Sequence, residues 1–224
     1  MGPFILGESN FFVSWRIEST CSRLTPDDVL LIDLHYLPCL DVMRGMAQAT
    51  EVQIEAHENY HKQSYRNRCY VLTANGVDCL TVPVLNGTHR QRTRDVRIDY
   101  SQKWIDRHLR CLQSAYAKAP YFEYLMPDLE AILAQRLPLL FDLNWSLLTF
   151  CRKWARITTP VNLTEWYERD TPVGVFDARS RVIPAKRGET GLFGPQRPYL
   201  QNFGTVFEPN LSILDALFMG VANA

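Results

Sequence analysis

The order of apolar and polar positions predicts strands in the first part of the chain. An unbroken apolar run, Val29–Leu34, is typical of a buried strand, and a short helix is expected to follow it to about Ala49. From Glu51 to Ala56 apolar and polar residues alternate, which predicts a half-buried strand. These two segments are expected to lie in one sheet.

A hairpin is expected next. The runs Cys69–Thr73 and Cys79–Val82 flank Asn75-Gly76, a dipeptide that favours tight turns between antiparallel strands. Pro83 lacks a backbone N–H and is expected to end the second strand. The alternation from Asp95 to Tyr100 predicts one further strand.

From Ser101 the period of the pattern changes to that of a helix. Trp104, His108, Leu112 and Tyr116 recur every four residues and would share one helical face, with Ser101 as a plausible N-cap. Two more helices are predicted over residues 127–137 and 138–154. Residues 160–210 are rich in proline and glycine, and we expect them to be extended.

These elements predict an α/β fold. It comprises an N-terminal mixed β-sheet with a hairpin, a helical half, and an extended C-terminal segment that wraps around the rest. Residues 1–27 are interpreted as an N-terminal extension and residues 28–220 as a single domain. Within that domain, 28–100 would be mainly sheet, 101–158 mainly helical, and 159–220 an extended tail that ends in a short helix over Asn210–Phe218, capped by Asn210 or Ser212.

Composition excludes several classes of function. Lys+Arg and Asp+Glu both count 24, so the chain has no net charge, which argues against a nucleic-acid-binding protein. No apolar run reaches the roughly 18 residues of a membrane-spanning helix. The six cysteines are scattered without a CxxC pair, which indicates reduced thiols, a cytoplasmic location and no metal site. Gly-rich phosphate-binding motifs are absent, so no cofactor is expected, and the pattern leaves the oligomeric state open.

The densest group of polar side chains lies between the second and third predicted strands, from His57 to Cys69. Such density on a loop beside rigid elements is typical of a binding or catalytic site. The alternative is an internal hydrogen-bond network that holds an irregular loop. The residues that could bind an anion, a sugar or an amide here are Tyr60, Lys62, Gln63, Arg66, Asn67 and Arg68.

Histidines outside this loop are further candidates. His35 follows the first strand, where α/β sheets place their ligands, and could act as a general base or merely cap a turn. Asp99 comes just before the helix that carries Trp104 and His108. Asp99 and His108 could therefore form a catalytic pair, or His108 could be a core residue beside Trp104. Cys69 and Cys111 could be nucleophiles or inert buried thiols.

The chain resembles the WbqC-like protein family over about residues 29–220, in a form similar to the Bacteroidetes branch of that family. The resemblance rests on segments that are specific in combination: His35-Tyr36-Leu37-Pro38, Glu58-Asn59-Tyr60, Lys62-Gln63, Tyr65-Arg66-Asn67-Arg68-Cys69, Asn75-Gly76, Leu80-Thr81-Val82-Pro83-Val84, Val96-Arg97-Ile98-Asp99-Tyr100, Trp104, His108, Ala119-Pro120-Tyr121-Phe122, Pro198-Tyr199-Leu200-Gln201 and Pro209-Asn210-Leu211-Ser212-Ile213-Leu214-Asp215.

The resemblance implies a role in making surface polysaccharides. Members of the family are found among surface-polysaccharide genes, and some are described as transferases of an amino-acid or acyl group to an amino sugar. The implied substrate is a small-molecule, nucleotide-linked or lipid-linked sugar. In that scheme His57 or His108 is the base, with His35 as a further catalytic candidate, and Asp99 orients the base. Lys62, Arg66 and Arg68 bind the anionic part, Asn67 donates to the oxyanion, and Trp104 is a further substrate-binding candidate.

Two other hypotheses remain open. The protein could be a non-catalytic binding or scaffold protein of a polysaccharide-assembly pathway that uses the same loop for recognition. It could also be a cysteine-dependent hydrolase built on Cys69 or Cys111.

Overall fold

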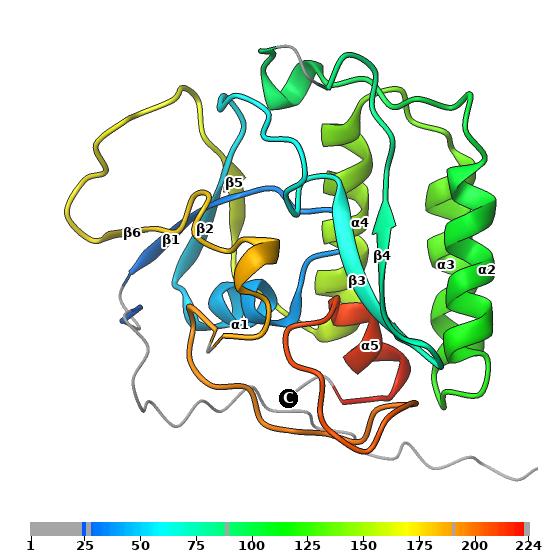
Figure 1. Ribbon diagram of the computed structural model, residues 1–224. Helices are drawn as coiled ribbons and strands as arrows, with labels where there is room; N and C mark the ends of the chain where they lie inside the picture. The colour runs from blue at the N-terminus through cyan, green and yellow to red at the C-terminus, as the bar shows by residue number, and fades with distance from the viewer. Residues whose placement is uncertain (1–23, 26–27, 88–89, 190, 222–224) are drawn as a thin grey trace, which may run out of the picture.

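A four-stranded parallel sheet forms one side of the protein, as shown by a computed structural model that describes residues 24–25, 28–87, 90–189 and 191–221 (Figure 1). The predicted N-terminal extension, residues 1–27, lies almost wholly outside these described residues. The strand order is β5-β2-β1-β6, and every neighbouring pair is parallel. The strands are β1 (Val29–Asp33), β2 (Glu51–Glu55), β5 (Val161–Leu163) and β6 (Val175–Asp177).

Helix α1 (Leu40–Gln48) connects β1 to β2, as two adjacent parallel strands require. Leu30, Ile32, Val52 and Ile54 alternate along these strands and are fully buried in the same core as the apolar residues of α1. The strands and helix predicted for this region are confirmed.

An antiparallel hairpin is separate from the parallel sheet. β3 (Arg68–Thr73) and β4 (Gly76–Thr81) pair with Thr73 opposite Gly76, so the predicted hairpin is confirmed. Gly76 has a φ of +99°, which a side chain would strain. β3 packs against α2 (Trp104–Tyr116) and α5 (Ile213–Phe218).

The prediction of a strand from Asp95 to Tyr100 is wrong. A 3-10 turn, Thr93–Asp95, is followed by isolated bridges in which Arg97 meets Leu139 and Ile98 meets Val84. The backbone N–H groups of Ile98 and Asp99 donate to the carbonyls of Pro138 and Pro83, respectively. Because neither proline has an N–H to return, the ladder cannot continue.

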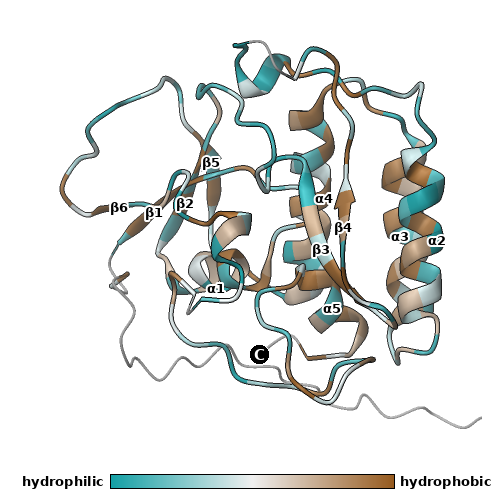
Figure 2. Cartoon of the chain, in the orientation of Figure 1, coloured by the Kyte–Doolittle hydropathy of each residue, from teal (hydrophilic) through white to brown (hydrophobic). Residues whose placement is uncertain are grey.

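The helical half consists of α2, α3 (Phe122–Ala134) and α4 (Leu140–Ala155). α2 is banded in teal and brown in Figure 2, as expected of a helix with one polar and one apolar side. α3 begins five residues before the predicted start at Pro127 and carries that proline inside it. The stripe Phe122, Leu125, Met126 and Leu129 is buried on both sides of Pro127, and this packing outweighs the proline signal.

The extended tail contributes two strands that the sequence pattern did not reveal. β5 and β6 are three residues each and lie at opposite edges of the sheet. The tail then runs back along the molecule to α5, drawn in red in Figure 1. Ser212, one of the two predicted caps, caps α5 by accepting from the Leu214 N–H.

The parallel sheet, the hairpin and the helices together confirm the predicted α/β class. Among the described residues, none of the helices combines the length and apolar character needed to span a bilayer.

Candidate functional site

Five residues gather at the carboxyl end of β1, and we call them the edge cluster: Asp33, His35, Glu58, Arg66 and Ser180. Asp33 ends β1, and Ser180 follows β6, the strand on one side of β1. β2 lies on the other side, so the chain leaves β1 toward one neighbour and returns to it through the other. Ligands of open α/β sheets bind at such a position.

Asp33 is the centre of the edge cluster. Its Oδ2 lies 2.8 Å from His35 Nε2 and 3.3 Å from an Arg66 nitrogen, and its Oδ1 accepts from the Ser180 N–H at 2.7 Å. Burial alone would raise the pKa of Asp33, but the charge of Arg66 and the hydrogen bonds from His35 and the Ser180 N–H outweigh burial and lower it. Asp33 is therefore ionised, and its Oδ2 accepts a hydrogen bond from His35 Nε2–H.

This arrangement fixes the tautomer of His35. When Nε2 donates to Asp33, the neutral ring keeps its lone pair on Nδ1. The His35 ring is buried and stacks on Tyr65 with centroids 5.3 Å apart, and its Nδ1 has no hydrogen-bond partner among the described residues. An oriented imidazole with a bare lone pair is what a general base requires.

Arg66 joins two carboxylates. It donates to Glu58 through Nε at 2.6 Å and through a terminal nitrogen at 2.5 Å, and it also donates to Ser180 Oγ at 3.0 Å. Burial raises the pKa of Glu58 to about 7, against the opposing effect of Arg66. One guanidinium thus faces two acids, Asp33 and Glu58. If His35 takes up a proton, its positive charge would be balanced by the second of these two carboxylates.

Beside the edge cluster is a cavity of about 350 Å³, which we call the tail cavity because residues 180–183, 186, 189, 191 and 192 form much of its wall. Ser180 lines this cavity and also holds Asp33 through its N–H. The charged and amide residues on its wall are Asp41, Arg181, Lys186, Glu189 and Asn210. Burial raises the pKa of the Asp41 carboxyl, although the N–H groups of Phe193 and Leu192 donate to it.

The polar loop predicted as a site divides into an inner and an outer part. Glu58, Arg66 and Asn67 are buried, and Asn67 Nδ2 donates to the Val82 carbonyl at 3.0 Å. Tyr60 is 8 % exposed, and its hydroxyl lacks a partner among the described residues. Lys62 and Gln63 are exposed, whereas Arg68 is half-buried in β3. The loop is therefore partly an internal network and partly surface.

The other candidate histidines lie apart from the edge cluster and from each other. His57 Nε2 lies 3.0 Å from the Thr164 carbonyl, next to β5. His108 Nδ1 lies 2.9 Å from the Tyr36 hydroxyl, and its ring meets Trp104 edge-on at 5.1 Å. Asp99 accepts from Ser101 and Gln102 near the surface, so the structure does not join Asp99 to His108.

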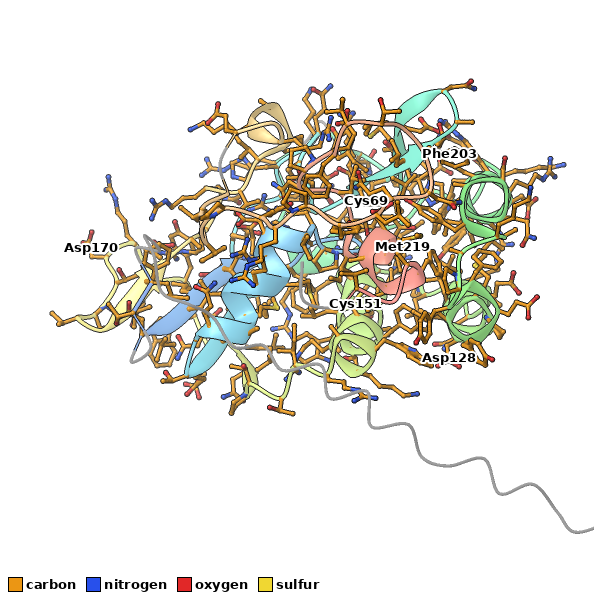
Figure 3. All side chains as sticks on the ribbon, turned by 90° about the horizontal axis from the view of Figure 1, so that it is seen from below. Cys69, Asp128, Cys151, Asp170, Phe203 and Met219 are labelled. Atoms are coloured by element: carbon orange, nitrogen blue, oxygen red, sulfur yellow. The ribbon has the colours of Figure 1, made fainter. Side chains whose placement is uncertain are left out.

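The two candidate nucleophiles, Cys69 and Cys111, show no sign of activation. Figure 3 places Cys69 and Cys151 well inside the molecule. Burial raises the pKa of Cys69 well above its usual value and that of Cys111 to about 11, where Asp78 also opposes ionisation. Within the described residues, no group of three His, Cys, Asp or Glu side chains is arranged to hold a metal ion.

Sequence reasoning missed the partners that complete the edge cluster. Asp33 is not among the predicted site residues, and Ser180 lies in the tail, 147 positions further along the chain. The spacing Asp33-x-His35 after an apolar run was the available signal. No local signal marks Ser180, because only the parallel pairing of β6 with β1 brings it to the site.

Comparison with known proteins gives one family and one relative. The model of the WbqC-like protein family matches residues 34–178. The chain is 28% identical over 215 residues to "Uncharacterized protein Rv1507c" of Mycobacterium tuberculosis, which covers 85% of this chain and 92% of the relative. No solved structure matches the chain.

Proposed function

Since this chain belongs to the WbqC-like protein family, we propose that it is a transferase in surface-polysaccharide synthesis, with the edge cluster as its catalytic centre. The reaction proposed is transfer of an aminoacyl or acyl group to the amine of a sugar precursor. The observation that carries the proposal is the Asp33–His35 pair at the carboxyl end of β1, with His35 Nδ1 bare.

In this proposal His35 Nδ1 removes a proton from the sugar amine as its nitrogen attacks the acyl carbon. The carbon–nitrogen bond forms, the bond to the leaving group breaks, and the imidazolium returns the proton to that group. Asp33 holds the ring and stabilises the imidazolium, as the acid of a catalytic triad does. Arg66 is a positioning residue, because both carboxylates already occupy its guanidinium.

The tail cavity is proposed to receive the acyl donor. Arg181 and Lys186 are exposed cations on its wall and could bind a phosphate or carboxylate of the donor. His35 itself is 1 % exposed, so the donor has to displace part of the cavity wall to reach it. Ser180, held in the left-handed region at a φ of 54°, lies in the wall segment that would move.

The test is to replace His35→Gln and Asp33→Asn and to analyse the surface polymer of the bacterial host by mass spectrometry. Loss of a general base lowers rates by roughly 10²- to 10⁴-fold, so the acyl substituent should disappear. His61→Gln is the matched control, because His61 is exposed and outside the edge cluster. Melting of each purified variant establishes that it folds. A fully substituted polymer in a strain whose His35→Gln protein is folded would contradict the proposal.

A further inference from the structure

A second cavity, of about 370 Å³, lies on one face of the parallel sheet, and we call it the sheet-face cavity. Its floor carries Leu31 of β1 and Gln53 of β2, and its roof is the segment between β5 and β6. Both faces of parallel sheets are normally covered, usually by helices. Here a loop with a hollow beneath it covers the face, and Asp170 marks the outer tip of that loop in Figure 3.

The floor of this cavity is polar where a core would be apolar. β2 is an inner strand of the sheet, and its Val52 and Ile54 point to the opposite face and are fully buried. Gln53 faces the cavity, half-buried, and its side-chain amide makes no hydrogen bond to a described residue. A donor and an acceptor are therefore available to a bound molecule.

Aromatic and acidic side chains form the wall. Trp166 is 60 % exposed, and its Nε1 donates to Glu168 at 2.7 Å, which fixes the indole relative to that carboxylate. Glu165 and Glu168 line the cavity, and the cation on its wall, Arg179, is already paired with Glu55 at 3.0 Å and with Asp177. The wall thus has an excess of negative charge beside an indole face.

We propose that the sheet-face cavity binds an amino sugar in its ammonium form, as an acceptor that gives up one proton to a wall carboxylate before its neutral amine attacks at the edge cluster. The carboxylates of Glu165 and Glu168 attract the ammonium, the indole of Trp166 covers the cation or the C–H face of the ring, and Gln53 bonds a hydroxyl. The volume is large enough for one sugar ring. The acceptor role rests on the proposed function, whereas the binding itself does not.

The position of the cavity fits an acceptor. Asp33 and Glu55 are register partners at the ends of β1 and β2, and Glu55 lines this cavity. Arg179 borders the sheet-face cavity, and the next residue, Ser180, borders the tail cavity and holds Asp33. The two cavities therefore flank one dipeptide beside the edge cluster.

The test is titration of the purified full-length protein with glucosamine, followed by the indole N–H signal of Trp166 in NMR spectra and by calorimetry. Glucosamine should bind more tightly than glucose or N-acetylglucosamine, and added salt should weaken its binding. Trp166→Ala should weaken binding by roughly two- to fivefold. Glu165→Gln and Glu168→Gln should weaken glucosamine binding but not binding of glucose. Tyr124→Ala and Glu130→Gln are matched controls, being exposed positions on α3 outside the cavity.

Equal affinities for glucosamine and glucose, or glucosamine affinities in the Trp166→Ala and Glu168→Gln variants that equal those of the Tyr124→Ala and Glu130→Gln controls, would overturn the inference. Failure of the proposed function is separable from this result, because it is measured on the polymer of the His35→Gln strain. The two results can also differ: glucosamine could bind as expected while the His35→Gln strain makes an unchanged polymer. That outcome would support the binding site and contradict the proposed transferase function.

Discussion

Arg66 carries its positive charge between Asp33 and Glu58 at a position that is 2 % exposed. Arg66→Met would leave two buried carboxylates without their cation, and loss of one partner from such a network costs about 3–5 kcal/mol of unfolding free energy. We expect a fall of that size in urea denaturation. Arg110→Met, at an exposed position on α2, is the matched control. A fall as small as that of Arg110→Met would mean that the cluster relaxes around the missing charge.

His108 is expected to make stability depend on pH. Burial lowers its pKa from 6.5 to about 4, so the folded state keeps it neutral where the unfolded state takes up a proton. Its contribution is therefore complete above pH 6.5 and is lost as the pH falls from 6.5 toward 4, by up to about 3 kcal/mol.

Unfolding free energies of the natural protein and of His108→Gln should consequently converge over that interval. His57→Gln serves as the comparison, since His57 packs beside the Thr164 carbonyl in a different part of the molecule. If plots of unfolding free energy against pH are parallel for the natural protein and His108→Gln, His108 takes up a proton equally well in the folded and unfolded states, which contradicts the prediction.

At the scale of elements, α1 packs closely against the tail at Gly45, where the absence of a side chain leaves room for Phe193. A Cβ built on Gly45 would lie 2.7 Å from the ring of Phe193, which is fully buried. Gly45→Ala gains about 1 kcal/mol of helix propensity but overpacks the contact, which costs about 1–3 kcal/mol. We expect a net loss of stability in thermal melts.

Phe193→Leu in the same chain should relieve the clash, so the double variant would lose less than the sum of the two single variants. Additive losses would indicate that α1 and Phe193 move apart without strain.

The elements that local pattern could predict are those whose partners are close in sequence. The hairpin around Gly76 and the helices α1 and α2 follow from turn chemistry and apolar spacing. β5 and β6 could not be found in this way, because three residues are too few for a period and their pairing partners lie far away in the chain. The same reason applies to the two sites: His35 and Arg66 stand out in the local sequence, whereas Ser180 and Arg179 are brought to their positions by the unpredicted strand β6.

For the whole molecule, we propose that residues 28–220 unfold as one cooperative unit. The tail supplies both outer strands of the sheet, and α5 is anchored by Ser212, which accepts from Leu214 and donates to the Leu37 carbonyl at 3.0 Å. Ser212→Ala should lower the unfolding free energy by about 1 kcal/mol.

If the tail and body are one unit, the far-ultraviolet signal of the helices and the near-ultraviolet signal of the aromatic residues should shift by the same amount. Ser146→Ala is the control, since the half-buried Ser146 donates to the Asp142 carbonyl of its own helix, α4. A shift seen by one probe alone would show that the tail melts separately from the body.

The pairing of β1 with β6 also has a consequence for folding during synthesis on the ribosome. Asp33 and Ser180 are 147 positions apart, so the ribosome has made most of the chain before the free edge of β1 can be closed. Until then the nascent polypeptide presents an unpaired strand, which is a template for association with other chains. β6 must therefore be synthesised before β1 has a neighbour on this side, and a messenger truncated before β6 would yield a product prone to aggregate.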